Sequence, residues 1–190
     1  MTGGTARTAD SRDGGFTLIE LIAILVLIGI LGAVASNRFI GRESFDARAY
    51  ADQTLSMLRF AQKVAIAQNR PVFVRLDGAS IALCFDATCA TRVLAPGGGN
   101  SATSMTLAAC AGDKSWFCEA PPKGARYSLS PPAPYATRPW FYFNALGKPY
   151  AAADAAVSGN STFEKLALEI QRSGERQTLI VEMETGHVHQ

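Results

Sequence analysis

Residues 14–35 read GGFTLIELIAILVLIGILGAVA, and this stretch decides how the rest of the chain is interpreted. Between residues 16 and 35 only one side chain is charged, that of Glu20. A helix of about twenty apolar residues matches the roughly 30 Å hydrocarbon core of a bilayer. A carboxylate inside such a span costs about 2.5–3.5 kcal/mol on insertion scales, so by default it has a partner and a function. We therefore predict a membrane-spanning helix in which Glu20 is a functional residue.

This segment does not have the pattern of a secretory signal peptide. Such a peptide has a shorter apolar region, a basic start and a cleavage site after the apolar region. Here the apolar run is longer, it carries a charge, and a pair of glycines stands before it. An ordinary single-pass anchor is the simpler alternative, with Glu20 reaching the headgroups near the helix end. An anchor, however, does not require the sequence Gly-Phe-Thr-Leu-Ile-Glu.

The glycine pair, the phenylalanine at the junction and the glutamate four residues later resemble the prepilin signature of type IV pilins and type II secretion pseudopilins. The resemblance covers residues 12–37 and implies that a membrane peptidase cuts between Gly15 and Phe16. It implies that Phe16 is then N-methylated, and that Glu20 meets the free amine of a neighbouring subunit during assembly. Two features depart from the family. The leader is neutral rather than basic, and Asn37 stands where major pilins usually carry a helix-bending proline.

The helical pattern continues beyond the apolar segment. Residues 44–68 contain no glycine or proline, and their apolar side chains recur at steps of three and four, which is typical of an amphipathic helix. This stripe consists of Ala47, Tyr50, Ala51, Thr54, Leu58, Ala61, Val64 and Ala65. Because Pro71 disfavours helix in the residue before it, we expect the helix to end near residue 69. One helix from residue 16 to residue 69 would be roughly 80 Å long.

After Pro71 the period of the sequence changes to two, which indicates strands. Residues 72–77 and 80–85 predict a hairpin that turns at Asp77 and Gly78. Further strands are expected at residues 91–94, 126–129, 140–144, 163–171 and 178–184. In the last two, Leu166, Leu168 and Ile170 would share one face, as would Leu179, Val181 and Met183.

Together these patterns predict an α+β fold, in which a long N-terminal helix packs on a mainly antiparallel β-sheet domain, and the resemblance to prepilins implies that this fold is pilin-like. The resemblance implies that residues 1–15 are the leader and that residues 16–37 are the transmembrane and assembly helix. We expect residues 38–69 to form its amphipathic continuation and residues 70–190 to form the periplasmic β-rich domain.

The globular part also resembles one subfamily, the secretion minor pseudopilin called H and the related minor pilin of the mannose-sensitive haemagglutinin pilus. Three short motifs carry this likeness: LRFAQK at residues 58–63, FNALG at residues 143–147 and ETGHV at residues 184–188. The cysteines in the first hairpin favour the pilus-type relative.

Four cysteines lie in the part that is expected to be exported: Cys84, Cys89, Cys110 and Cys118. An even number in an oxidising compartment favours disulfides, and three connectivities are possible. We favour Cys84 with Cys89 and Cys110 with Cys118, because each pair closes a short loop between expected strands. Zinc is the rival interpretation, but the C-x7-C spacing fits zinc motifs poorly.

Nothing in the sequence indicates catalysis, a cofactor or a metal site. The two histidines, His187 and His189, stand at the end of the chain without a nucleophile or a third metal ligand in view. The leader carries two charges of each sign, so its removal leaves the net charge at +2. Such a weak charge gives no case for nucleic-acid binding.

The leading hypothesis is a minor pilin or pseudopilin of a type IV pilus or a type II secretion pseudopilus. Its expected partners are other subunits, the prepilin peptidase, the inner-membrane assembly platform and membrane lipid. We expect a single-pass inner-membrane precursor with a periplasmic C-terminal domain, which then enters a fibre. Arg38 and Arg42 would favour the opposite orientation on the positive-inside rule, and we give the motif precedence. The alternative is a membrane-anchored periplasmic binding module that does not polymerise, with the aromatic residues 140–143 as its ligand face.

Overall fold

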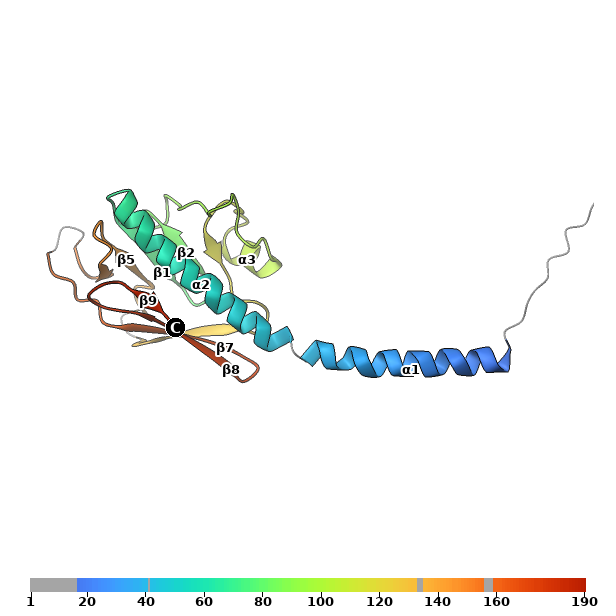
Figure 1. Ribbon diagram of the computed structural model, residues 1–190. Coiled ribbons are helices and arrows are strands. Elements are labelled where there is room, and N and C mark those ends of the chain that lie inside the picture. Colours follow the sequence, from blue (N-terminus) through green and yellow to red (C-terminus); the bar gives the residue numbers. More distant parts are fainter. Residues whose placement is uncertain (1–16, 41, 133–134, 156–158) are drawn as a thin grey trace, which may run out of the picture. The chain divides into compact units, whose positions relative to one another are not determined.

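The computed structural model describes residues 17–40, 42–132, 135–155 and 159–190, with the side chains of residues 33–40 and 42–44 outside the description. It divides into two units, residues 1–41 and 42–190. The first unit holds helix α1 (Leu18–Ile40), and the second holds helix α2 (Arg42–Ala67) and the strands (Figure 1). Residue 41 lies outside the described residues, so one continuous helix through it remains a prediction.

Helix α2 has the amphipathic character that its sequence predicts. Every residue of the expected stripe is buried except Val64, which is partly buried, while Arg48, Asp52, Arg59 and Lys63 on the other face are exposed. The helix ends at Ala67, two residues before the expected end. Most of its buried face consists of small or aliphatic side chains, so its stability in this domain comes from packing against the strands.

The first sheet has five strands in the order β3 (Cys118–Glu119), β2 (Ile81–Cys84), β1 (Val72–Leu76), β5 (Trp140–Phe143) and β6 (Pro149–Ala151). The predicted hairpin is formed by β1 and β2, with Phe73 opposite Cys84 and Leu76 opposite Ile81. Its turn is held by Asp77, whose Oδ1 accepts the backbone N–H of Ser80 at 2.8 Å. Gly78 in this turn has φ +84°, a conformation that favours glycine.

The second sheet has four strands in the order β4 (Arg126–Ser130), β7 (Leu166–Arg172), β8 (Glu175–Val181) and β9 (Val188–His189). Strands β7 and β8 form a hairpin around Ser173 and Gly174. Leu166, Leu168 and Ile170 share a buried face, as predicted. Met183 does not: β8 ends at Val181, and the Met183 side chain beyond it is 48% exposed.

The prediction of a strand at residues 91–94 is wrong, because this segment forms no regular strand. This segment makes only isolated bridges, of Arg92 with Cys84 and of Leu94 with Trp116, in the part of the chain that the structure describes. The short helix α3 (Ser104–Ala109) was not expected; Thr103 caps it by accepting the N–H of Thr106 at 3.1 Å. Strands β3, β6 and β9 were also not expected as strands.

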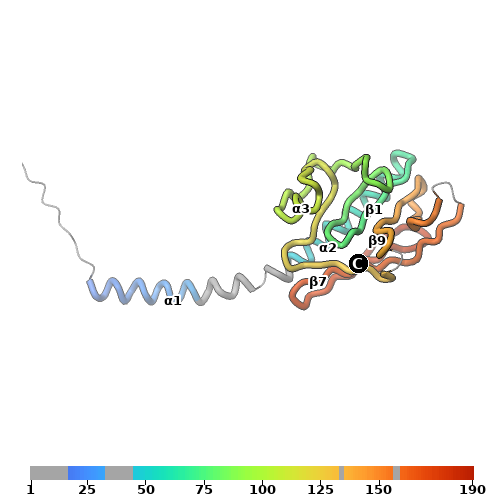
Figure 2. The backbone as a smooth tube through the Cα atoms, turned by 180° about the vertical axis from the view of Figure 1, so that it is seen from behind, coloured from blue at the N-terminus to red at the C-terminus, as the bar shows by residue number. Residues whose placement is uncertain are grey.

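The core lies where the buried face of α2 meets the inner faces of both sheets. Met57, Leu58, Val74, Phe141 and Leu179 are among its fully buried side chains. Figure 1, and Figure 2 from behind, place α3 and β7 on opposite sides of α2. The strand pairs that the structure describes are all antiparallel. The predicted α+β class, with a helix packed on antiparallel sheets, is therefore confirmed.

Candidate assembly site

The residues with a predicted role in processing and assembly lie at the start of the chain. Gly15 and Phe16 are outside the described residues, so the cut between them and the methylation of Phe16 remain predictions. Glu20 is described, in the first turn of α1. It is exposed, and it is the only acidic residue that this first turn contains.

Thr17 caps helix α1, a contact that the sequence analysis did not anticipate. Its Oγ1 accepts the backbone N–H of Glu20 at 3.3 Å, and its carbonyl oxygen accepts the same N–H at 3.1 Å. Thr-x-x-Glu is the sequence signature of a capping box, in which the glutamate also lies close to the positive end of the helix dipole. The spacing of Thr17 and Glu20 was the signal that would have revealed this cap.

The side chains around Glu20 are apolar and exposed. The exposed fractions of the large apolar residues of α1 run from 42% at Ile24 to 78% at Leu18. A helix that is apolar on all faces is normally covered, because each buried Leu or Ile side chain contributes about 1.5–3 kcal/mol relative to water. This surface is therefore suited to packing against other apolar groups.

Among the described residues, no helix combines the length and the apolar character that a membrane crossing requires. The membrane span predicted for residues 16–37 remains a prediction.

Gln62 on α2 holds together three segments that are far apart in the sequence. Its Nε2 donates to the carbonyl oxygen of Gly147 at 2.9 Å and to that of Thr185 at 2.8 Å. A Cβ added to Gly147 would lie 2.8 Å from Cδ1 of Ile66, and one added to Gly186 would lie 2.8 Å from Gln62 Nε2. The motifs at residues 58–63, 143–147 and 184–188 thus meet at one point, which we call the Gln62 junction (Gln62, Gly147, Thr185 and Gly186).

Both disulfides of the structure have the connectivity favoured above. Cys84 is bonded to Cys89, and Cys110 to Cys118. Within the first loop, Asp86 accepts the Thr88 hydroxyl at 2.6 Å and the Thr91 N–H at 2.6 Å. These hydrogen bonds, that of Thr88 foremost, lower the pKa of Asp86 below its usual value.

The second disulfide loop is organised by two carboxylates. Asp113 accepts the Ser115 hydroxyl at 2.7 Å and Arg92 Nη1 at 2.7 Å, which lowers its pKa to about 2. Glu119, directly after Cys118, is 2% exposed and accepts the Ser101 N–H at 2.7 Å and the Ser101 hydroxyl at 2.5 Å. Its buried oxygens are thus paired with neutral donors.

The histidines form part of the C-terminal hairpin. The His187 and His189 rings stack with centroids 5.5 Å apart, and His189 Nε2 lies 3.1 Å from Glu182 Oε1. Glu182 also pairs with Lys165 Nζ at 3.2 Å. No group of three metal-ligating residues is found in the part of the chain that the structure describes.

The aromatic strand proposed as a ligand face is almost entirely covered. Phe141 and Phe143 of β5 are fully buried and Tyr142 is 2% exposed, whereas Trp140 alone is partly exposed. Tyr142 packs between Phe73 and Tyr150, with ring centroids 5.1 and 5.3 Å away. Strand β5 therefore does not offer the four aromatic side chains to a ligand, which weakens the binding-module alternative.

Comparisons with known proteins bear on the N-terminal segment. The family described as "Prokaryotic N-terminal methylation motif" matches residues 10–36, which include Gly15, Phe16 and Glu20. The chain therefore carries a prokaryotic N-terminal methylation motif. We assign the chain no enzymatic activity on the basis of this match.

One curated relative is the type IV narrow pilus major component PilA5 of Thermus thermophilus. The two are 39% identical over 61 residues, a match that covers 32% of this chain and 53% of PilA5. The chain thus spans about half the length of this relative.

Two solved structures of type IV pilin-like proteins are also similar. One is the minor pseudopilin EpsH from the type 2 secretion system of Vibrio cholerae, with TM-score 0.46 and 14% identity over 76% of this chain and 94% of EpsH. The other is the type IV minor pilin FimU of Pseudomonas aeruginosa, with TM-score 0.44 and 12% identity over 75% of this chain and 85% of FimU.

Proposed function

We propose that this chain is a minor pilin or pseudopilin, a structural subunit of a type IV pilus or a type II secretion pseudopilus. It is made as an inner-membrane precursor with its C-terminal domain in the periplasm. The prepilin peptidase removes residues 1–15, Phe16 is methylated, and the inner-membrane assembly platform moves the subunit into a fibre of similar subunits. The observation that carries this proposal is the methylation motif, whose matched residues 10–36 include the exposed apolar side chains of α1.

The apolar surface of α1 supports the transfer of the subunit from the membrane into the fibre, because both surroundings are apolar. In the precursor the lipid covers these side chains, and in the fibre the helices of neighbouring subunits cover them. Both surroundings remove Leu18, Leu25 and Leu31 from water, although they are more than 60% exposed in the single chain. The burial energy of α1 is therefore similar in both states, and contacts of other kinds decide where the subunit goes.

Glu20 supplies such a contact. A carboxylate that is taken into an apolar bundle is tolerated only if an opposite charge offsets the cost of its desolvation. Among the residues of α1 whose side chains the structure describes, Glu20 is the one with a charge. Its partner is the free amine of Phe16 on an adjacent subunit, which exists only after the leader has been removed. This order of events prevents the uncut precursor from making the contact.

The Gln62 junction supports the finer assignment to the pseudopilin H type, with the minor pilin of mannose-sensitive haemagglutinin-type pili as the nearer relative. The three motifs that carry this likeness are connected by the two hydrogen bonds of one side chain. The Cys84–Cys89 disulfide at the end of β2 supports the pilus-type relative.

Intact mass spectrometry of the protein extracted from membranes tests the processing step. We expect an N-terminal Phe16 that is one methyl group heavier than the unmodified residue, because the motif places the cut after Gly15. A bulky residue in place of Gly15 should block the cut. Recovery of the uncut chain alone, from cells with an active prepilin peptidase, would contradict the proposal.

A further inference from the structure

A row of polar side chains crosses the second sheet near the β7–β8 turn. Arg126 on β4 is the cross-strand partner of Gln171 on β7, which in turn is opposite Arg176 on β8. Residues directly opposite one another in neighbouring strands project from the same face. Because Ile170 is buried on the α2 side, this Arg126–Gln171–Arg176 row projects from the outer face of the sheet.

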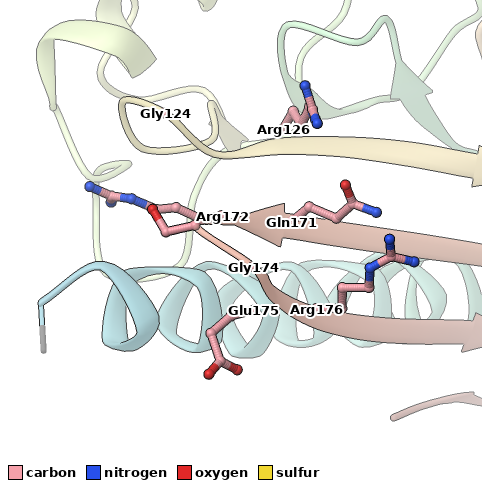
Figure 3. A pocket seen from close by; sticks show the side chains of 8 residues that line it. Gly124, Arg126, Gln171, Arg172, Gly174, Glu175 and Arg176 are labelled. Atoms are coloured by element: carbon pink, nitrogen blue, oxygen red, sulfur yellow. The ribbon is translucent and has the colours of Figure 1, made fainter.

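The row lines a surface pocket of about 370 Å³. Figure 3 shows Arg126 and Arg176 on either side of Gln171, while the Glu175 side chain points away from them. Strands lie about 4.8 Å apart, so the two arginine Cα atoms are separated by roughly 10 Å. Side chains as long as arginine cover that separation, and both guanidinium groups can therefore reach a single ligand above Gln171.

The charges of the row are only partly neutralised. Arg176 Nη1 lies 3.1 Å from Oε1 of Glu169, and Gln171 Nε2 donates to the same oxygen. Arg126 is exposed and has no ion-pair partner among the described residues. Glu169 thus places a carboxylate oxygen on one half of the row and leaves the other half open.

We propose that the Arg126–Gln171–Arg176 row binds a phosphate group. Guanidinium groups form paired hydrogen bonds with the oxygens of phosphate, and the central amide of Gln171 supplies another donor. The ligand competes with Glu169 for Arg176 and adds the unpaired Arg126. Because Glu169 competes with the ligand, the proposal predicts that removal of the Glu169 charge strengthens phosphate binding.

Two sources could supply this phosphate, the headgroup of an anionic lipid and free phosphate, and the row would recognise the same chemistry in both. The lipid source rests on the proposed function, in which the precursor lies in the inner membrane. Free phosphate does not require that function.

Binding is measured on the full chain in detergent, with phosphatidylglycerol, phosphatidylcholine and inorganic phosphate as separate probes. Native mass spectrometry follows the lipids and calorimetry follows the phosphate. For Arg126→Ala/Arg176→Ala we expect the affinity for phosphatidylglycerol to fall by at least about tenfold, as the loss of a charge-assisted hydrogen bond implies. Glu169→Gln should raise that affinity severalfold. The matched control Lys63→Ala/Lys114→Ala removes two exposed charges elsewhere and should change nothing.

The probes separate the two sources of phosphate. A preference for phosphatidylglycerol that depends on both arginines supports the headgroup, and the same dependence with inorganic phosphate alone supports free phosphate. Equal phosphatidylglycerol binding by the wild type and the double arginine variant, both shown by circular dichroism to be folded, overturns the proposal. Weaker binding by Glu169→Gln also overturns it. The N-terminal mass of each variant is measured in parallel, so that a failure of leader processing is recognised separately.

Discussion

Gln62 donates its side-chain amide to the carbonyl oxygen of Gly147 at 2.9 Å, and this contact ties the end of helix α2 to the β5–β6 turn. The same nitrogen also donates to Thr185, in the turn before β9. Both acceptors are backbone carbonyl oxygens in turns. One amide group therefore positions the two turns against the helix.

Gln62→Ala should lower the free energy of unfolding by about 1–3 kcal/mol, because two carbonyl oxygens lose their donor. Chemical denaturation of the full chain in detergent measures this change. Lys63→Ala is the matched control on the exposed face of the same helix and should stay within about 0.5 kcal/mol of the wild type. Equal midpoints for the wild type and Gln62→Ala would show that the junction adds nothing to stability.

Gly147→Ala should destabilise the same junction for a different reason. Gly147 has φ +80°, and its added methyl group would lie 2.8 Å from Ile66 Cδ1. We expect a loss of about 1–3 kcal/mol from strain and overpacking together. In the double variant Gly147→Ala/Ile66→Ala the steric part should be relieved, so the combined loss should be smaller than the two single losses added together. Strict additivity would contradict the packing argument.

The disulfide connectivity is tested by peptide mapping without reduction. We expect Cys84 linked to Cys89 and Cys110 linked to Cys118, as the structure has them. Short loops of this kind contribute very roughly 2–3 kcal/mol each in the loop-entropy account. Any peptide that joins Cys84 to Cys110 would refute the connectivity.

Asp113 should make stability depend on pH in the acid range. Its pKa in the folded chain is about 2, lowered by the Ser115 and Arg92 hydrogen bonds from an ordinary value of 3.8. A group with a lowered pKa stabilises the fold fully above its unfolded value and loses that effect as the pH falls toward the folded value. Between pH 4 and pH 2 the wild type should therefore lose more stability than Asp113→Asn. Parallel pH profiles in thermal melts would argue against this role.

The parts of the fold that were predicted correctly have a periodic pattern of apolar residues within a short stretch of sequence. The alternation of Val72, Val74 and Leu76 defines one face of β1, and the stripe of α2 from Ala47 to Ala65 repeats over about five turns. Strands β3 and β9 have two residues each, too few for any periodicity. The segment at residues 91–94 is paired through isolated hydrogen bonds, such as that from Val93 N–H to Leu83 O at 3.1 Å, and forms no continuous ladder that a sequence period would reveal.

The candidate sites also differ in whether a short stretch of sequence reveals them. Glu20 stands out because it is a single charge in an apolar run, and Thr17 is found by its spacing to Glu20. The Arg126–Gln171–Arg176 row depends on the register between β4 and β7, which are separated in the sequence by β5 and β6. The register between such distant strands is set by the packing of the whole sheet, so no local sequence pattern predicts the row.

Incorporation of Glu20→Ala into fibres tests the central claim most directly. The variant keeps the Thr17 cap on the Glu20 N–H and loses only the carboxylate, with its dipole contribution of about 0.3–1 kcal/mol. It should enter the membrane at least as well as the wild type, because a buried charge is removed. Thr17→Ala is the matched control: it weakens the cap by about 1 kcal/mol and retains the carboxylate.

The measurement is the amount of each variant that co-purifies with sheared fibres, relative to its amount in the membrane fraction, with the N-terminal mass confirming that the leader has been removed. The account predicts that Thr17→Ala enters fibres and that processed Glu20→Ala remains in the membrane. Fibres that contain Glu20→Ala at the wild-type level would contradict the account, because the carboxylate would then not be an assembly contact.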